Sequence, residues 1–542
     1  MKYIHKRFFR KYPIFGVFLL VAVIGCKKEL DLQEYPKEQL SEAIFWNNKA
    51  DAEKALTACY RAENWTGWWN NFNGWNILGI KFEGWTDILS NKELGSGFPQ
   101  AGIVSTDQQV KDMWSSNYAR IARANYFLDN IAKVTMTEME RSEMVAEAKF
   151  LRAYSYFWLS QLYGNVPLVE KTLTFDEANS VKQATQKEVV EFAIKELMEA
   201  ERNLPVRRSA AQKGRVEKGA ALALLGRFLM AEKRWAEAAE TYKKIIDLNR
   251  YVIDNRFKEL FQDEGDNSDE IIFSRKYMQD VFGEPMTQLA SVPGWYGGYT
   301  QFSFFQNFVD RFLMIDGKSI DESPLYDPAN PFENRDPRLY ATVLLPDYSF
   351  VNGKKYVGHP DSTKQTGPGV TGYGLNKFYD PSYAGDKNRY GGDYKLMRYA
   401  EVLLSYLEAN LESGAVITQS LLDETINKVR GRQEIKMAAV TETDPQKLRT
   451  IVRNERAVEL ACEGGIRYWD LIRWKIAVET LNRKFYGMKI TDNPAQYTGK
   501  YVINEKGEIF IQERKFEDRN YLWPIPQSEL DVNPNLKQNP GY

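Results

Sequence analysis

Apolar side chains recur at spacings of three and four residues along two parts of the chain, and this periodicity predicts α-helices. In the first part, the predicted helices are 41–60, 107–134, 138–163, 186–202, 216–231 and 234–248. In the second part, they are 396–412, 418–431, 445–463 and 467–481. The pattern therefore predicts a mainly α protein with two helical regions. Residues 41–250 and 251–542 are the approximate halves of the fold.

Two long segments lack this periodicity. Residues 61–105 are rich in Trp, Asn and Gly, and residues 251–394 are rich in Gly, Pro, Asn and Asp. Within the second segment, a helical pattern occurs at 304–314 and a short apolar strand is predicted at 269–274. Irregular segments of this length in a compact protein usually carry function. We therefore expect ligand-contacting residues in these segments.

One helix pair, between residues 222 and 250, has the spacing of a tetratricopeptide repeat. Small residues at such positions let two antiparallel helices approach, and large residues fill the groove between them. The matching residues are Leu225, Gly226, Leu229, Ala238, Tyr242 and Ile245. Several neighbouring helix pairs have similar lengths, so we expect a tetratricopeptide-like helical-repeat scaffold with long irregular loops and a few short strands.

The first 25 residues have the pattern of a secretory signal peptide. Five basic residues precede an apolar run at 14–24, which is too short for an ordinary membrane span. The run ends at Gly25-Cys26, which resembles a bacterial lipobox in which Cys26 becomes the lipidated first residue. Ordinary cleavage beside an incidental cysteine is the alternative. We expect 1–25 to be removed, 26–40 to be a tether, and 41–542 to be the fold.

The charge and residue counts exclude several function classes. Without residues 1–25, the chain has 67 basic and 73 acidic side chains, a net charge of −6, so nucleic acid is not an expected partner. His359 is then the only histidine, which excludes a multi-histidine zinc site. Cys59 and Cys462 lie in apolar helical contexts and are expected to be buried free thiols, although a disulfide stays possible. No metal or cofactor is expected.

Aromatic residues make up 13% of the chain, with 13 Trp and 31 Tyr. Two loop-like segments carry clusters of them. Sugar rings stack their C–H faces on flat aromatic rings, while Asn and Asp side chains bind the hydroxyls. The candidate ligand-binding residues are Trp68, Trp69, Asn73, Trp75, Trp85 and Asp87 in the first segment, and Trp295, Tyr296 and Tyr299 in the second. The alternative is that these aromatics fill seams of the core, because tryptophan is mostly buried.

Three further patterns do not support catalysis or a bound ion. Residues 367–372 fit a glycine-rich dinucleotide motif, but neither a strand before them nor a helix after them is predicted. The acidic run 263–270 lacks the spacing of an EF-hand calcium loop and is interpreted as a solvated turn, with an irregular calcium site as the alternative. Glu83 and Asp87 would share one face of a helix, yet with 73 acids in the chain such pairs are expected by chance. No catalytic residue is assigned.

Several stretches, in their order along the chain, resemble the SusD/RagB family of Bacteroidetes nutrient-uptake lipoproteins. These stretches are 146–157, 164–169, 335–339, 398–404, 455–474, 522–526 and 533–542. The resemblance covers essentially the whole chain after the signal peptide. Departures are an extra glycine at Gly464-Gly465 and the basic pair Lys27-Lys28 directly after Cys26. Arg467, Asp470 and Arg473, which lie in one of the stretches, are expected to form buried ion pairs between helices.

The resemblance implies a surface-facing lipoprotein of the outer membrane, anchored through Cys26, whose irregular segments form the ligand face. It also implies that the protein binds oligosaccharides and passes them to a SusC-like TonB-dependent β-barrel transporter, without enzymatic activity. Three alternatives stay open: peptide capture as in some relatives, a glycoside hydrolase, and a helical-repeat adaptor that binds only protein. The sequence does not identify the glycan, its linkage or the transporter.

Overall fold

The computed structural model describes residues 45–61, 80, 82–91, 102–283, 288, 301–351, 353–357, 371–490 and 501–542. The chain divides into two units, Met1–Phe45 and Trp46–Tyr542, and the second contains the helices and strands given below. The predicted signal peptide and tether, with the lipidation site Cys26, lie outside the described residues. Within the described part of the chain, the helices are too short or too polar to cross a membrane.

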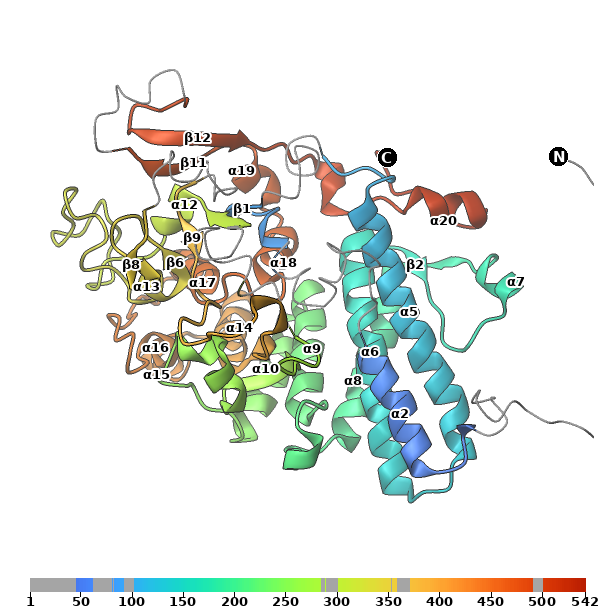
Figure 1. The fold of residues 1–542 in the computed structure, drawn as a ribbon. Helices are drawn as coiled ribbons and strands as arrows, with labels where there is room; N and C mark the ends of the chain where they lie inside the picture. Colours follow the sequence, from blue (N-terminus) through green and yellow to red (C-terminus); the bar gives the residue numbers. More distant parts are fainter. Residues whose placement is uncertain are drawn as a thin grey trace, which may run out of the picture. The chain divides into compact units, whose positions relative to one another are not determined.

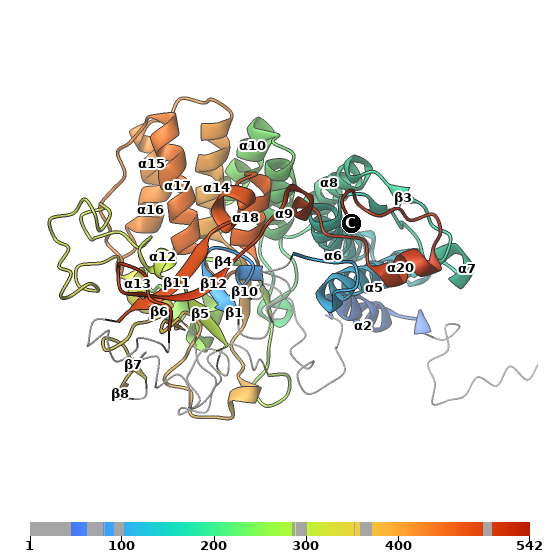
Figure 2. The same cartoon turned by 90° about the horizontal axis from the view of Figure 1, so that it is seen from above.

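Helices dominate the second unit, and its longer helices form a continuous array (Figure 1). Each helix packs on the next in the order α2, α5, α6, α8, α9, α10, α14 and α17, and Figure 2 shows them in this order. Their bounds are α2 Lys49–Tyr60, α5 Gln108–Asn130, α6 Glu138–Tyr163, α8 Gln186–Asn203, α9 Lys218–Ala231, α10 Trp235–Asp247, α14 Tyr399–Glu412 and α17 Pro445–Glu459. The prediction of a mainly α fold is confirmed.

Helix α6 lies in the middle of the array, and its ends follow from local sequence signals. At its start, the Thr137 side chain accepts from the backbone N–H of Glu140, while the Glu140 carboxylate accepts from the Thr137 backbone. This capping box satisfies two backbone groups that a helix start otherwise leaves unpaired. Gly164 ends the helix with a φ of 70°, a conformation that glycine adopts without strain. From Met144 onwards most α6 side chains are buried, because α5 and α8 cover it.

The close approach expected for the helix pair α9–α10 is present. A Cβ added to Gly226 on α9 would lie 2.4 Å from the ring of Tyr242 on α10, which is closer than real Cβ contacts. Because Gly226 has no side chain, the Tyr242 ring can pack directly against the α9 backbone at this residue, where Tyr242 is buried. This contact confirms the tetratricopeptide-like packing of this pair.

Shorter helices connect and extend the array. They are α7 Phe175–Ala178, α12 Gln306–Val309, α13 Arg338–Thr342, α15 Gln419–Glu424, α16 Ile426–Arg430, α18 Ile466–Arg473, α19 Ala477–Leu481 and α20 Gln527–Val532. Single turns of 3₁₀ helix are η2 Ile131–Lys133, η3 Ala210–Gln212, η4 Glu259–Phe261, η5 Asp263–Asn267, η8 Lys387–Arg389 and η10 Asp518–Tyr521.

The strands are short and come mainly from the segment between α10 and α14. A four-stranded sheet has the order β1 Leu89–Asn91, β5 Phe302–Phe304, β9 Gly374–Leu375 and β6 Val343–Leu344. The antiparallel pairs are β4 Ile271–Arg275 with β10 Tyr394–Arg398, β11 Lys484–Lys489 with β12 Glu508–Glu513, β2 Val166–Pro167 with β3 Gln183–Ala184, and β7 Phe350–Val351 with β8 Lys354–Lys355. The long segment thus interrupts the helical array, which α14 resumes.

The C-terminal tail crosses back to the first helices of the array. The backbone N–H of Trp523 donates to the carbonyl of Leu162 at the end of α6. The Asn539 side-chain amide donates to the carbonyl of Tyr163 at 2.9 Å, and that of Asn533 donates to Val181 at 2.8 Å. The tail therefore connects the two halves of the helical region.

Candidate functional site

Two of the sequence-predicted ligand residues, Trp85 and Asp87, lie in the described segment 82–91. Trp85 is 4% exposed and packs edge-on against Phe82, with ring centroids 4.9 Å apart, and against Trp523 at 5.2 Å. Phe82 in turn stacks on Trp158 of α6 and on Tyr468 of α18. The aromatic cluster therefore joins the 82–91 segment, two helices and the C-terminal tail.

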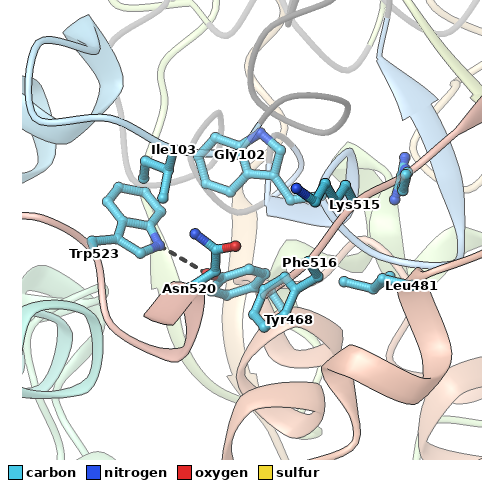
Figure 3. A pocket seen from close by; sticks show the side chains of 10 residues that line it. Gly102, Ile103, Tyr468, Leu481, Lys515, Phe516, Asn520 and Trp523 are labelled. Carbon is cyan, nitrogen blue, oxygen red and sulfur yellow. Dashed lines mark hydrogen bonds between the residues drawn. The ribbon is translucent and has the colours of Figure 1, made fainter. Parts of the chain in front are cut away.

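A hollow opens beside this cluster (Figure 3). Trp523 donates from its indole N–H to the Tyr468 hydroxyl at 2.8 Å, which fixes both rings in the wall. The remaining lining residues are Trp85, Gly102, Ile103, Leu481, Arg514, Lys515, Phe516 and Asn520. The cavity volume is about 30 Å³, enough for a water-sized group. This hollow is therefore too small to hold a sugar ring.

Asp87 is fully buried and bound by guanidinium groups. Arg467 of α18 donates from Nε and from Nη2 to the two carboxylate oxygens, both at 2.9 Å, and Arg311 donates from Nη2 at 2.7 Å. Burial opposes ionisation of Asp87, but Arg467 and then Arg311 outweigh it and lower the pKa of its carboxyl. These contacts favour a structural role, in which Asp87 ties the 82–91 segment to α18.

Glu83, one turn before Asp87, has the opposite electrostatic environment. Its side chain is fully buried, and in the described structure Oε1 has no hydrogen-bond partner. Burial raises the pKa of Glu83 to about 8, although Arg467 acts in the other direction. The two carboxyl groups therefore differ in charge at neutral pH: Asp87 is ionised and Glu83 is protonated.

A network of buried ion pairs underlies the second half of the fold. Glu459 of α17 accepts from Arg398 and Arg432 at 2.7 Å each and from Arg338 at 2.8 Å. Burial disfavours the charge of Glu459, but these three guanidinium groups lower its pKa well below the ordinary value. Glu270 also accepts from Arg398 and Arg432. The network joins the residue before β4, strand β10, helix α13, the segment after α16 and helix α17.

The predicted ion pairs of α18 are confirmed. Asp470 accepts from Arg456 of α17 at 2.9 Å and from Arg473 at 2.9 Å, and Arg473 also binds Glu408 of α14. Arg467 binds Asp87 as described above. All these side chains are buried, so they hold helices together and are not available to a ligand.

The acidic run 263–270 is only partly the solvated turn that its sequence predicts. Asp263 and Glu264 are exposed, but Glu270 is fully buried in the ion network, and Asp266 binds Lys395 of β10 at 2.7 Å. The prediction is therefore wrong for Glu270, because cations from β10 and from Arg432 surround it. Across the described residues, no group of three or more His, Cys, Asp or Glu is arranged to hold a metal ion.

The thiols of Cys59 and Cys462 are free and buried, as expected. The remaining sequence-predicted ligand residues lie outside the described part of the chain, so their role stays a prediction. They are Trp68, Trp69, Asn73, Trp75, Trp295, Tyr296 and Tyr299.

The structure adds a partly exposed aromatic pair that the sequence analysis missed. Tyr277 and Phe282 stack with centroids 5.5 Å apart and planes inclined by 8°, held by a bridge between Met278 and Phe282. Phe282 is 47% exposed. Sequence spacing gives no signal for this pair, because the reversal of the chain at 279–281 is what brings the rings together.

The sequence profile of the SusD family matches residues 257–542, and a profile described as "Starch-binding associating with outer membrane" matches residues 38–230. The chain belongs to the SusD family. This SusD-family protein is also similar to a crystal structure of a SusD-like carbohydrate binding protein from Bacteroides fragilis, with 34% identity and a TM-score of 0.84. That match covers 91% of this chain and 100% of the other.

Two curated relatives extend the comparison. A SusD-like protein of Formosa agariphila is 25% identical, over 98% of this chain and 100% of the relative. The starch-binding protein SusD of Bacteroides thetaiotaomicron is 25% identical, over 78% of this chain and 76% of the relative. The SusD-family membership predicted from the motif stretches is thus confirmed.

Proposed function

We propose that this SusD-family protein is a lipid-anchored lipoprotein of the outer membrane that faces the cell exterior and captures oligosaccharides. It passes them to a SusC-like TonB-dependent transporter and does not hydrolyse them. The observation that carries the proposal is the similarity, along nearly the whole chain, to a solved SusD-like carbohydrate binding protein. The lipobox-like Gly25-Cys26 supports the anchor.

The arrangement of the described residues supports a binding role. The charged side chains of 455–474 are buried and paired, so the most charged part of the family pattern stabilises the scaffold. A rigid scaffold reduces the conformational freedom that the loops carrying aromatic rings lose on binding. Stacking on a few exposed rings gives modest single-site affinities, roughly micromolar to millimolar.

Native affinity electrophoresis against a panel of polysaccharides and peptides tests this proposal, with a reducing-sugar assay on the same mixtures. Retardation by a glycan without new reducing ends is the expected result. Retardation only by peptides would mean that the ligand is a peptide and not a glycan. New reducing ends would mean that the protein is an enzyme. Capture of the tagged chain from detergent-solubilised outer membranes should also bring down a β-barrel transporter, and its absence would contradict the proposed partner.

A further inference from the structure

Two adjoining hollows lie between the C-terminal end of α2, the loop before α9 and strand β4. Their volumes are about 380 and 190 Å³. They share the wall residues Lys213, Gly214, Arg215, Phe273, Ser274 and Lys276, so we treat them as one groove, the basic groove. The larger hollow is also lined by Glu217, Asp266 and Asp269, which pair with Arg250 or Lys395. A groove of this volume is typical of a site for a small ligand rather than of a surface that binds a protein.

Cations predominate in the smaller hollow of the basic groove. The described residues that line it include Lys213, Arg215, Arg275 and Lys276 but no carboxylate. Two carboxylates lie behind the wall: Glu147 binds Arg215 with an N–O distance of 3.3 Å, and Asp393 binds Lys276. Both carboxylates are buried, so they balance these two cations from the protein side.

Lys213 and Arg275 are left without a carboxylate within 4 Å among the described residues. Among the described residues, the ammonium of the exposed Lys213 is hydrogen-bonded to an amide oxygen only, that of Asn267. Burial, and then the positive charge of Lys276, lower the pKa of Lys213. The groove therefore holds positive charge that an anion would balance.

Arg275 is similarly unbalanced. It donates from Nη1 to the Tyr60 carbonyl at 2.7 Å, and its buried Nε has no hydrogen-bond partner in the described structure. Its guanidinium carbon lies 5.4 Å from the centre of the Phe282 ring. Arg275 thus joins the basic groove to the Tyr277–Phe282 pair, of which Phe282 is exposed and Tyr277 is half-buried.

The position of the groove in the sequence connects it to the predicted ligand loops. Arg61, which follows Tyr60, is the last described residue before the segment with Trp68 and Trp75. Gly283, which follows Phe282, and Gln288 are the last described residues before the segment with Trp295. In the sequence, residues of the groove and of the Tyr277–Phe282 pair therefore stand shortly before both predicted aromatic segments.

We propose that the captured oligosaccharide is acidic, bearing uronate carboxylates or sulfate esters, and that Lys213 and Arg275 bind these groups. The inference rests on the proposed glycan capture and specifies its substrate class. Guanidinium and ammonium groups form stronger, charge-assisted hydrogen bonds with such oxyanions than with neutral hydroxyls. Tyr277 and Phe282 supply the neighbouring apolar contact.

The test uses the purified full chain in affinity gels that contain polygalacturonate, its methyl ester, a sulfated galactan or its desulfated form, beside neutral polysaccharides. The variants are Lys213→Gln and Arg275→Gln. The control is Lys447→Gln, a residue whose side chain is 73% exposed at the start of α17. We expect retardation by an acidic polymer and not by its neutralised form. Each groove variant should weaken it about 3- to 10-fold and the control should not.

The outcomes separate the substrate class from the proposed function. Retardation by polygalacturonate alone identifies uronate, and retardation by the sulfated galactan alone identifies sulfate; either supports the inference. Retardation by neutral polymers only overturns the inference and leaves glycan capture standing. Equal retardation of wild type and both groove variants overturns the assignment to Lys213 and Arg275. No retardation by any polymer overturns glycan capture itself. If Arg275→Gln does not fold, Lys213→Gln decides, because Lys213 is exposed.

Discussion

Replacing Glu83 by Gln removes one ionisable group from the core while keeping its shape. Glu83 is fully buried, and in the described structure its Oε1 has no hydrogen-bond partner. The Thr86 hydroxyl donates to the Glu83 carbonyl at 2.8 Å, so it offers the carboxyl group only a longer contact of 3.4 Å. A charge here is costly, and the folded protein keeps Glu83 protonated.

The magnitude follows from the pKa difference between the folded and the unfolded states. The pKa of Glu83 is raised from 4.5 to about 8. The folded state therefore binds a proton that the unfolded state releases, and stability falls as the pH rises through this window. One pKa unit corresponds to about 1.36 kcal/mol, so the wild type loses about 3 kcal/mol between pH 4.5 and pH 7 through this group.

Urea unfolding of wild type and Glu83→Gln at pH 5, 6, 7 and 8, at fixed ionic strength, measures this effect. The variant should gain stability relative to wild type as the pH rises, by about 3 kcal/mol over the series. Glu459→Gln is the matched contrast, because three guanidinium groups lower the pKa of Glu459. That variant should lose about 3–5 kcal/mol, nearly the same from pH 5 to pH 8, because the free energy that Glu459 contributes falls only below the ordinary pKa of 4.5.

The pH dependence of the stability difference between variant and wild type tests the protonation state assigned to Glu83. A stability difference between Glu83→Gln and wild type that is constant from pH 5 to pH 8 would mean that Glu83 is ionised in the folded state as it is in the unfolded state. Loss of stability for both Gln variants, with the same pH dependence, would mean that burial and ion pairing do not separate the two carboxyl groups.

Three further predictions concern packing, anchoring and binding. Gly226→Ala should cost about 1–3 kcal/mol in urea unfolding, because the new Cβ overlaps the Tyr242 ring; an unchanged midpoint would contradict the close packing. Cys26→Ala should move the protein from the membrane to the soluble fraction, and persistent membrane association would refute the lipid anchor. Trp295→Ala should weaken glycan binding and leave the melting temperature nearly unchanged, whereas a large fall in melting temperature would place Trp295 in the core.

The long helices were predictable from sequence because periodicity and caps agree. Helix α6 spans the predicted 138–163, and its Thr137 capping box fixes the start. The shorter C-terminal helices were predicted less well. The predicted helix 396–412 begins only at Tyr399, because 394–398 pair with β4 as a strand. The predicted helix 418–431 is divided at Thr425, whose φ and ψ of −120° and −97° are not helical. Apolar periodicity does not reveal such tertiary effects.

At the candidate site, residue type alone does not predict which side chains are free to contact a ligand. Trp85 and Asp87 have suitable side chains for a sugar, but Trp85 packs in an aromatic cluster and Asp87 pairs with Arg467, 380 residues later in the chain. The Tyr277–Phe282 pair and the basic groove depend on a chain reversal and on segments far apart in sequence. Only the fold brings those residues together.

The most direct measurement of the central claim is a calorimetric titration of the full chain with the oligosaccharide that retards it in affinity gels, followed by analysis of the recovered sugar. The account predicts saturable binding with a Kd roughly between micromolar and millimolar, and an oligosaccharide recovered at its original length. No saturable binding by any oligosaccharide, or recovery of shortened products, would contradict capture without hydrolysis.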